Sequence, residues 1–245
     1  MKAAGFSIIE MMVALTLGLI LSTLLFNNYV DAAGALSMQS SMYHLQEVVN
    51  VSNDIITHEI EQAGYIGCAK LVPGFPVKHF QQYSLTAGNQ LIVTDVNIIS
   101  RHASMMNAEL LNLNPDKKTL YVSDNLSFKA DDILIISDCQ HAEIFKVKHI
   151  FHLHQQLKIE AVMPLDSDFD KNAEVAYFET NRLFLKKMGN NKKALFLEDV
   201  KLFHRQITDG VEALHFVSKL HGIVFSETIR VNALQREWGG YASIS

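Results

Sequence analysis

The chain has 245 residues, a formal net charge of −5 and a hydrophobic content of 49%. This length accommodates one membrane-spanning helix and a head of about 180 residues, the size of an ordinary domain. The acidic balance argues against a protein that binds nucleic acid regardless of sequence, because such proteins depend on clustered lysine and arginine. It leaves room for a small local basic patch.

The first thirty residues combine a short basic leader with a long apolar run. Lys2 is the one charge before Glu10, and residues 11–26 carry none. Runs of this kind are typical of secretory signal peptides and transmembrane helices. Neither explains a carboxylate at Glu10, because an ionised group at membrane depth is unfavourable without a partner.

Residues 5–15, Gly-Phe-Ser-Ile-Ile-Glu-Met-Met-Val-Ala-Leu, resemble the prepilin cleavage and methylation motif of type IV pilins and type II secretion pseudopilins. The resemblance implies cleavage between Gly5 and Phe6 by a prepilin peptidase and N-methylation of Phe6. It also implies subunits that stack helix against helix in a filament. Glu10, the fifth residue of the mature chain, would pair with the α-amino group of Phe6, its own or a neighbour's, and so help to set the register.

Residues 6–63 are predicted to form one long helix, because the stretch contains no proline and only Gly18 and Gly34. Its first part is apolar on all sides, as a membrane span or filament core requires. The second part is amphipathic, with a stripe that would face a sheet: Leu45, Val48, Val49, Ser52, Ile55, Ile56, Glu59, Ile60 and Ala63. Gly64 and Gly67 are predicted to end the helix.

The residues after this helix narrow the resemblance. Residues 61–68, Glu-Gln-Ala-Gly-Tyr-Ile-Gly-Cys, are similar to the helix exit of the PilW branch of minor pilins. Further matches lie at residues 132–139, which end at Cys139, and at residues 210–216, with a looser match between them. The chain is therefore identified as resembling a PilW-like minor pilin.

After Pro76 the pattern changes to short β-type runs separated by turn signals. Strands are predicted at residues 90–96, 119–122, 132–137, 143–149, 157–162, 174–179, 182–187, 194–197, 201–206, 211–218 and 223–231. The Met- and Ala-rich residues 104–113 are expected to form a short helix. The predicted fold class is α+β: a long N-terminal helix packed on a mainly antiparallel head. The expected domains are a leader (1–5), a transmembrane or filament-core helix (6–30), and the amphipathic helix continuation with the head (31–245).

Charge and cysteines together suggest where the head resides. Lys2 precedes the apolar run and acidic residues follow it, so the N-terminus is expected in the cytoplasm and the head in the periplasm, if the cell has an outer membrane. In that compartment Cys68 and Cys139 are expected to form a disulfide, whereas in a reducing compartment they would be two buried thiols.

Few other motifs suggest chemistry. His149, His152 and His154 lie close together, but further zinc ligands at suitable spacing are not evident. Asp166, Asp168 and Asp170 resemble the opening of a calcium loop that lacks the central glycine and the closing glutamate, and a solvated acidic loop explains them equally well. The sequence shows no nucleophile elbow, phosphate loop or zinc-protease string. We expect neither an enzyme nor a bound cofactor.

The resemblance implies a minor pilin that takes part in initiating type IV pilus assembly, in a priming or tip complex. Implied partners are other minor pilins, the major pilin, a tip adhesin, the prepilin peptidase and the inner-membrane assembly platform. The protein would begin as a single-pass inner-membrane protein and end at the pilus tip or at low copy in the filament. Two alternatives stay open: a minor pseudopilin of a type II secretion system, and a head that acts as an adhesion or DNA-binding module.

Overall fold

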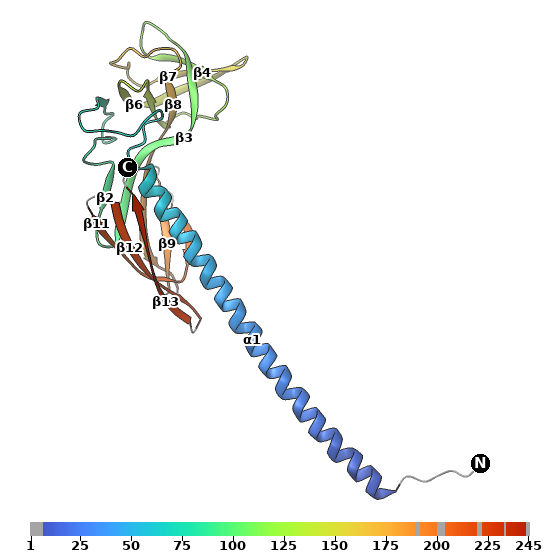
Figure 1. Cartoon of the computed structure of the whole chain (residues 1–245). Helices are drawn as coiled ribbons and strands as arrows, with labels where there is room; N and C mark the ends of the chain where they lie inside the picture. Colours follow the sequence, from blue (N-terminus) through green and yellow to red (C-terminus); the bar gives the residue numbers. More distant parts are fainter. Residues whose placement is uncertain (1–6, 190–191, 200–203, 220–221, 233, 244–245) are drawn as a thin grey trace.

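The computed structural model describes residues 7–189, 192–199, 204–219, 222–232 and 234–243. Its dominant element is α1 (Ile8–Gln62), a single helix that carries the head along its second half (Figure 1). With 55 residues it extends about 80 Å. Gly64 adopts a positive φ of 81° just beyond the helix, a backbone conformation that glycine tolerates best. The predicted helix and its end are thus confirmed to within two residues.

Ten strands form the larger sheet, in the order β10-β9-β8-β5-β6-β7-β4-β3-β2 with β1 beside β6. Their bounds are β1 (Val77–Lys78), β2 (Leu91–Val93), β3 (Asn97–Leu113), β4 (Thr119–Ser123), β5 (Ile133–Ser137), β6 (Ala142–Leu153), β7 (Gln156–Ala161), β8 (Glu174–Lys187), β9 (Lys193–Glu198) and β10 (His204–Asp209). Apart from the short parallel pair β1–β6, these pairings are antiparallel. The expectation of a mainly antiparallel sheet is confirmed.

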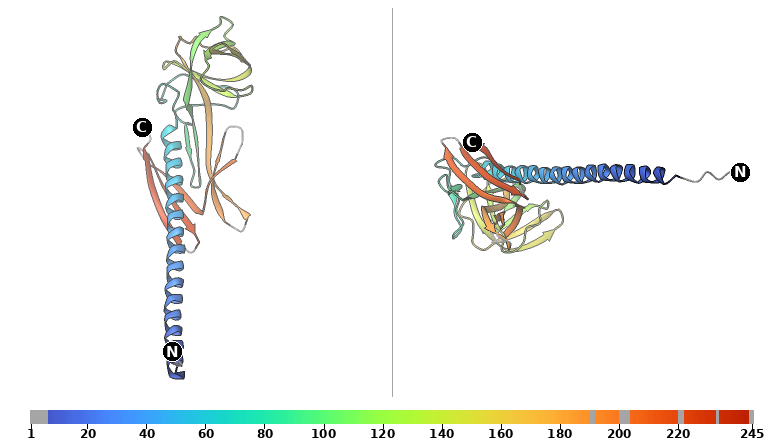
Figure 2. Two further views of the ribbon diagram at one scale, coloured as in Figure 1. Left: turned by 90° about the vertical axis from the view of Figure 1, so that its right-hand side faces the viewer. Right: turned by 90° about the horizontal axis from the view of Figure 1, so that it is seen from below.

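Six of these strands close into a ring, which we call the barrel: β3-β8-β5-β6-β7-β4 and back to β3. Its interior is filled by apolar side chains that alternate along the strands, among them Leu120, Ile136, Phe145 and Ile159. Closure leaves the barrel without a continuous free edge. The barrel lies at the end of the molecule farthest from the amino terminus (Figures 1 and 2).

The last three strands form a separate antiparallel sheet that lies beside α1 (Figure 1). We call it the C-terminal sheet: β11 (Val211–Lys219), β12 (Gly222–Val231) and β13 (Leu234–Ser243). Its inward side chains, such as Phe216 and Phe225, share one core with the buried stripe of the helix and with residues of β3, β8 and β9. The second half of α1 is therefore anchored to both sheets.

Several strands differ from the sequence prediction. Residues 104–113 are not a short helix but the second part of β3, which pairs with β8 and then with β4. The predicted strands 174–179 and 182–187 are one continuous strand, β8. Strands β1 and β13 and residues 97–103 of β3 were not predicted, and residues 201–203 of a predicted strand lie outside the described residues.

Candidate assembly interface

The first half of α1 has no packing partner within the described chain. Its large apolar side chains are exposed: Ile8, Ile9, Met11, Met12, Val13, Leu15, Leu17, Leu19, Ile20, Leu21, Leu24, Leu25, Phe26, Tyr29 and Val30. By length and composition α1 could cross a membrane, and none of its most apolar window is buried inside the protein. Exposed apolar surface of this extent indicates lipid or other helices as its natural surroundings.

Glu10 lies at the start of this helix. One of its carboxylate oxygens accepts the backbone N–H of Ser7 at 3.1 Å, which satisfies a donor that the first turn leaves free. Gly5 and Phe6, the residues of the expected cleavage and methylation site, lie outside the described residues. Ser7 is the second residue of the expected mature chain, so cleavage would create an amino terminus one residue before the group that Glu10 already binds.

A shallow groove on the exposed part of α1 is lined by small residues at one-turn spacing. Its lining consists of the small residues Ala14, Gly18 and Ser22 together with Met11, Leu15 and Leu19. Apart from the adjacent helix backbone, no atom lies within 4 Å of a Cβ built at Gly18. Small residues at four-residue spacing let another helix approach closely in a membrane or bundle, so this face is suited to helix packing.

The upper end of α1 is joined to the head through a buried polar network around Glu59. Its carboxylate accepts hydrogen bonds from the hydroxyl of Ser100 and, at 3.1 Å, from the amide of Asn181, and His102 Nε2 lies 3.6 Å away. Burial alone would raise the pKa of Glu59, but the nearby His102 imidazole and the hydrogen bonds from Ser100 and Asn181 outweigh it and lower the pKa. Burial opposes a charge on His102 as well, yet its interaction with Glu59 raises the pKa of the imidazole. Glu59 and His102 therefore favour each other's charged forms, and the network connects helix and sheet.

A second buried carboxyl, Glu227 on β12, contacts α1 at Ser52, about two helical turns before Glu59. It is 2% exposed, and Oε2 has no hydrogen-bond partner among the described residues. Ser52 Oγ lies 2.8 Å from both Glu227 Oε1 and the carbonyl oxygen of Val48. Since a hydroxyl has a single hydrogen, Ser52 donates fully to only one of these two acceptors, so Glu227 has little to stabilise a negative charge. Burial accordingly raises the pKa of Glu227 to about 7, although the Ser52 contact lowers it in part.

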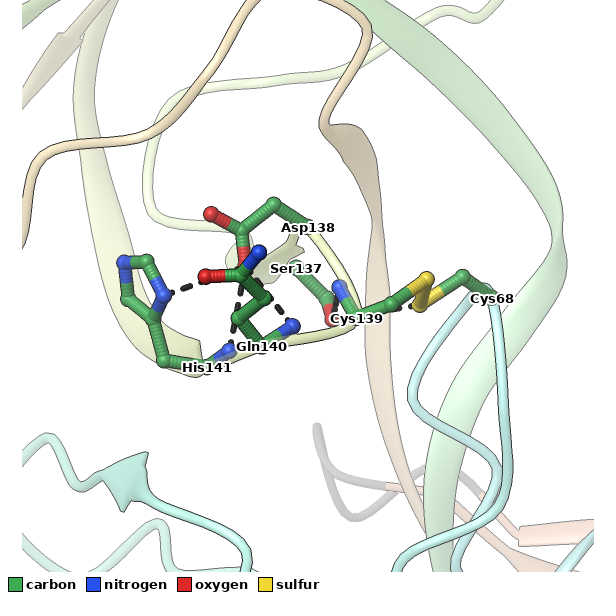
Figure 3. Close-up of a disulfide and its surroundings, with 6 residues drawn as sticks. All are labelled: Cys68, Ser137, Asp138, Cys139, Gln140 and His141. Carbon is green, nitrogen blue, oxygen red and sulfur yellow. Dashed lines mark hydrogen bonds and ion pairs between the residues drawn. A yellow bond between two sulfur atoms is a disulfide. The ribbon is translucent and has the colours of Figure 1, made fainter.

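Cys68 and Cys139 form a disulfide (Figure 3). Cys68 lies in the loop after α1, and Cys139 lies in the turn between β5 and β6. In this turn the Asp138 carboxylate accepts the backbone N–H groups of Gln140 and His141, both at 3.0 Å. The disulfide thus connects the end of the helix to a turn of the barrel.

The acidic loop after β7 is held by lysines and by a buried carboxylate. Asp166 lies 3.5 Å from Lys78 Nζ, and Asp168 lies 2.8 Å from Lys117 Nζ. The backbone N–H of Asp166 donates to Glu143 at 3.0 Å. Asp170 is exposed. These contacts favour the alternative of a solvated acidic loop over the calcium site.

The three clustered histidines lie on and beyond the outer end of β6. His149 and His152 belong to that strand and His154 to the turn after it, and all three are exposed. Within the ranges that the structure describes, no group of three or more histidine, cysteine, aspartate or glutamate side chains is arranged to hold a metal ion.

Glu227 was not predicted as a site residue, although the sequence of β12 contains a pattern that indicates its burial. Residues 223, 225, 229 and 231 are apolar and alternate along β12 with residues that are polar apart from Val224, and Glu227 occupies the same inward phase. A carboxylate at an inward position of an alternating strand identifies a buried titratable group. Its partner Ser52 was already part of the predicted helical stripe.

The model of the prokaryotic N-terminal methylation motif matches residues 1–26. Comparison with curated proteins and with solved structures gives no significant match for this chain. The fold agrees with the matched motif, because a long, initially apolar N-terminal helix packs on a mostly antiparallel head. Motif and fold together support a type IV pilin-like protein, of a pilus or a pseudopilus.

Proposed function

We propose that this protein is a minor pilin that takes part in initiating type IV pilus assembly, in a priming or tip complex. The observation that carries the proposal is the division of α1 into an exposed apolar first half and a second half with one face buried against the head. The exposed half needs partners from outside the chain, and helices of like kind in a filament would provide them. Its role is association, and no catalytic step is proposed.

The size and shape of the head favour a minor rather than a repeating subunit. The barrel is stacked beyond the part of the head that contacts the helix, so the head continues well past the end of α1 (Figure 2). Such an extension fits the end of a filament, where no further subunit must be accommodated above it.

The residues that resemble the PilW branch also have structural roles, which supports the narrower assignment. Gly64 and Gly67 both have positive φ angles, 81° and 108°. The disulfide between Cys68 and Cys139 connects two of the segments that carry the resemblance, residues 61–68 and 132–139. The resemblance therefore falls on positions that shape the helix exit.

The implied partners follow from this role: other minor pilins, the major pilin, a tip adhesin, the assembly platform and the prepilin peptidase. We propose that the leader 1–5 is removed, that residues 6–30 span the inner membrane before assembly, and that residues 31–245 face the periplasm. The apolar helix and the matched motif support a membrane anchor.

The test is deletion of the gene in its host, with surface pili counted in a normal strain and in one that cannot retract pili. A protein that promotes initiation should be needed for pili in the normal strain, while the strain that cannot retract regains some. Normal pili in both strains would contradict the proposal, and a concurrent secretion defect would then indicate a type II secretion pseudopilin. Complementation excludes a polar effect of the deletion.

Glu10 provides a sharper test of the assembly interface. We expect Glu10→Ala to abolish complementation while leaving the amount of protein in the membrane unchanged, because the variant lacks the carboxylate that would pair with an α-amino group in the apolar filament core. Glu61→Ala, which removes an exposed carboxylate from the same helix, serves as the control. Full piliation with Glu10→Ala would exclude the pairing.

A further inference from the structure

The hairpin of β6 and β7 forms a distinct surface on the barrel. Residues 147–153 of β6 pair with β7, whereas β5 pairs only with residues 142–146, so the outer half of β6 has one free side among the described strands. Residues 151–155 are all exposed. We call residues 148–160 the distal hairpin, because the barrel lies at the end of the molecule opposite the N-terminus of α1 (Figure 1).

The distal hairpin exposes apolar side chains that do not contribute to the barrel core. Phe151 and Leu153 are 48% and 41% exposed, and their two-residue spacing places them on one face of the strand. Lys158, directly opposite Phe151 in the β6–β7 register, has its ammonium group 5.3 Å from the centre of the ring. Tyr121 on β4 lies opposite Lys158 in the register of β4 and β7, next to the pair of Lys158 and Phe151. The result is an apolar and aromatic surface with a cation within it.

The charge of the distal hairpin is opposite to that of the whole protein. It contains Lys148, Lys158 and three histidines, and its single carboxylate, Glu160, accepts a hydrogen bond from Lys148 at 3.1 Å. The chain as a whole has a net charge of −5. With histidines counted as neutral, two lysines and one glutamate give the hairpin a formal charge of +1, and Lys158 places a cation beside the exposed Phe151.

We propose that the distal hairpin binds the surface of a membrane that contains anionic lipids. Phe151 and Leu153 would enter the boundary between headgroups and acyl chains, while the lysines bind the headgroups from the flanks of the ribbon. Single-stranded nucleic acid is the competing anionic partner. It is less well matched, because its bases stack on aromatic rings and gain little from the aliphatic Leu153.

The position of the hairpin determines which membrane it can meet. With α1 inserted in one bilayer, the barrel lies at the opposite end of the molecule, so the contact is with a second membrane (Figure 2). This binding is independent of filament initiation: it uses the head alone, and a failure in one assay leaves the other unaffected.

The experiment uses the full chain reconstituted through α1 into phosphatidylcholine liposomes, with outward heads confirmed by protease accessibility. Fluorescent vesicles of phosphatidylcholine alone, or of phosphatidylcholine and phosphatidylglycerol in equal parts, are added, and the captured fluorescence is measured after flotation. We expect about fivefold or greater preference for the anionic vesicles, diminishing as salt is added. Phe151→Ser/Leu153→Ser and, separately, Lys148→Gln/Lys158→Gln should reduce capture to the level of protein-free liposomes.

The matched control is Val217→Ser/Val224→Ser, which removes an exposed apolar pair from the C-terminal sheet and should leave capture unchanged. Unaltered unfolding midpoints show that the hairpin variants are folded. Equal capture of both vesicle types, or full capture by the folded hairpin variants, would overturn the proposal. So would binding of a labelled single-stranded oligonucleotide that depends on Phe151 and Lys158 in the absence of vesicle capture.

Discussion

Two buried carboxyl groups on the same interface have opposite electrostatic character because of their immediate neighbours. Glu59 has three polar partners, Ser100, His102 and Asn181, and it is held ionised. Glu227 has only Ser52, and no described charged side chain forms an ion pair with it. In the register of β12 and β13, Trp238 lies opposite Glu227. The nearest charged residue on the same face of β13 is Arg236, two positions from Trp238. Burial is similar, so the hydrogen-bond donors and the imidazole beside Glu59 account for the opposite directions in which the two pKa values move.

Glu227 should make the stability of the head depend on pH. Its pKa is about 7 in the folded chain against an ordinary value of 4.5, so the folded state binds a proton that the unfolded state releases. The stabilisation is complete below pH 4.5 and is lost as the pH rises towards 7, by about 3 kcal/mol in total. The side chain in Glu227→Gln stays neutral at every pH. We therefore expect the free energy of unfolding of this variant, measured by urea unfolding of the full chain in detergent, to lack this loss between pH 4.5 and 7.

Glu237→Gln is the control, since it removes an exposed carboxylate from the neighbouring strand β13. It should retain the wild-type dependence between pH 4.5 and 7. The same pH dependence in wild type and Glu227→Gln would show that another group is responsible.

At the scale of elements, the contact of α1 with the C-terminal sheet depends on the absence of a side chain at Gly240. A Cβ atom there would lie 2.4 Å from the ring of Phe225 and 2.8 Å from Asn53 Oδ1 on the helix. Glycine at this position therefore permits helix and strand to approach each other closely.

Gly240→Ala should accordingly destabilise the head by about 1–3 kcal/mol, because neither the buried Phe225 nor the helix can move away without loss of packing. Thermal unfolding of the full chain provides the measurement. Gly88→Ala, at a site with no atom within 4 Å of the added Cβ, should change the midpoint little. Equal midpoints for Gly240→Ala and wild type would mean that the interface is looser than the structure indicates.

The elements that sequence patterns predicted are those whose periodicity is set by a single partner. The stripe of α1 follows a helical period and faces one core, so nearly all of its predicted residues are buried. Strand β3 has several partners instead. Its residues 104–113 have the composition of a helix, yet pairing with β8 and β4 outweighs that propensity. A register shift between Ala103 and Asn107 also interrupts the alternation there and leaves Met105 and Met106 exposed.

Strand β13 escaped prediction for a related reason. Its adjacent Gly239 and Gly240 reduce intrinsic strand propensity, but the second glycine is required by the approach of α1, a contact that local sequence does not contain. The candidate assembly interface was more predictable than the head. The apolar run and Glu10 belong to one continuous segment, whereas the partners of Glu59 and Glu227 come from distant strands.

At the scale of the whole molecule, the head combines a part that contacts the helix with a barrel beyond it. Strands β3 and β8 run through both, so the two parts share a continuous hydrogen-bonded backbone. The disulfide adds a covalent connection between the helix exit and the barrel. The head should therefore unfold as a unit while the disulfide is intact.

Cys68→Ser/Cys139→Ser should lower the free energy of unfolding by about 4 kcal/mol, because the two residues are 71 positions apart and the cross-link restricts a long loop in the unfolded chain. Denaturant unfolding of the full chain is the measurement, and reduced wild type should behave like the double variant. A loss well below 1 kcal/mol would show that the turn at Cys139 is held by its hydrogen bonds alone.

The placement of this disulfide has a mechanical consequence. A subunit pulled by its helix transmits tension to the head through the buried stripe of α1 and then through the loop at Cys68. From there the load passes covalently into the turn between β5 and β6 rather than through hydrogen bonds that open one at a time. The barrel is thereby fastened to the pulling axis, and whatever it binds would be drawn along with the filament.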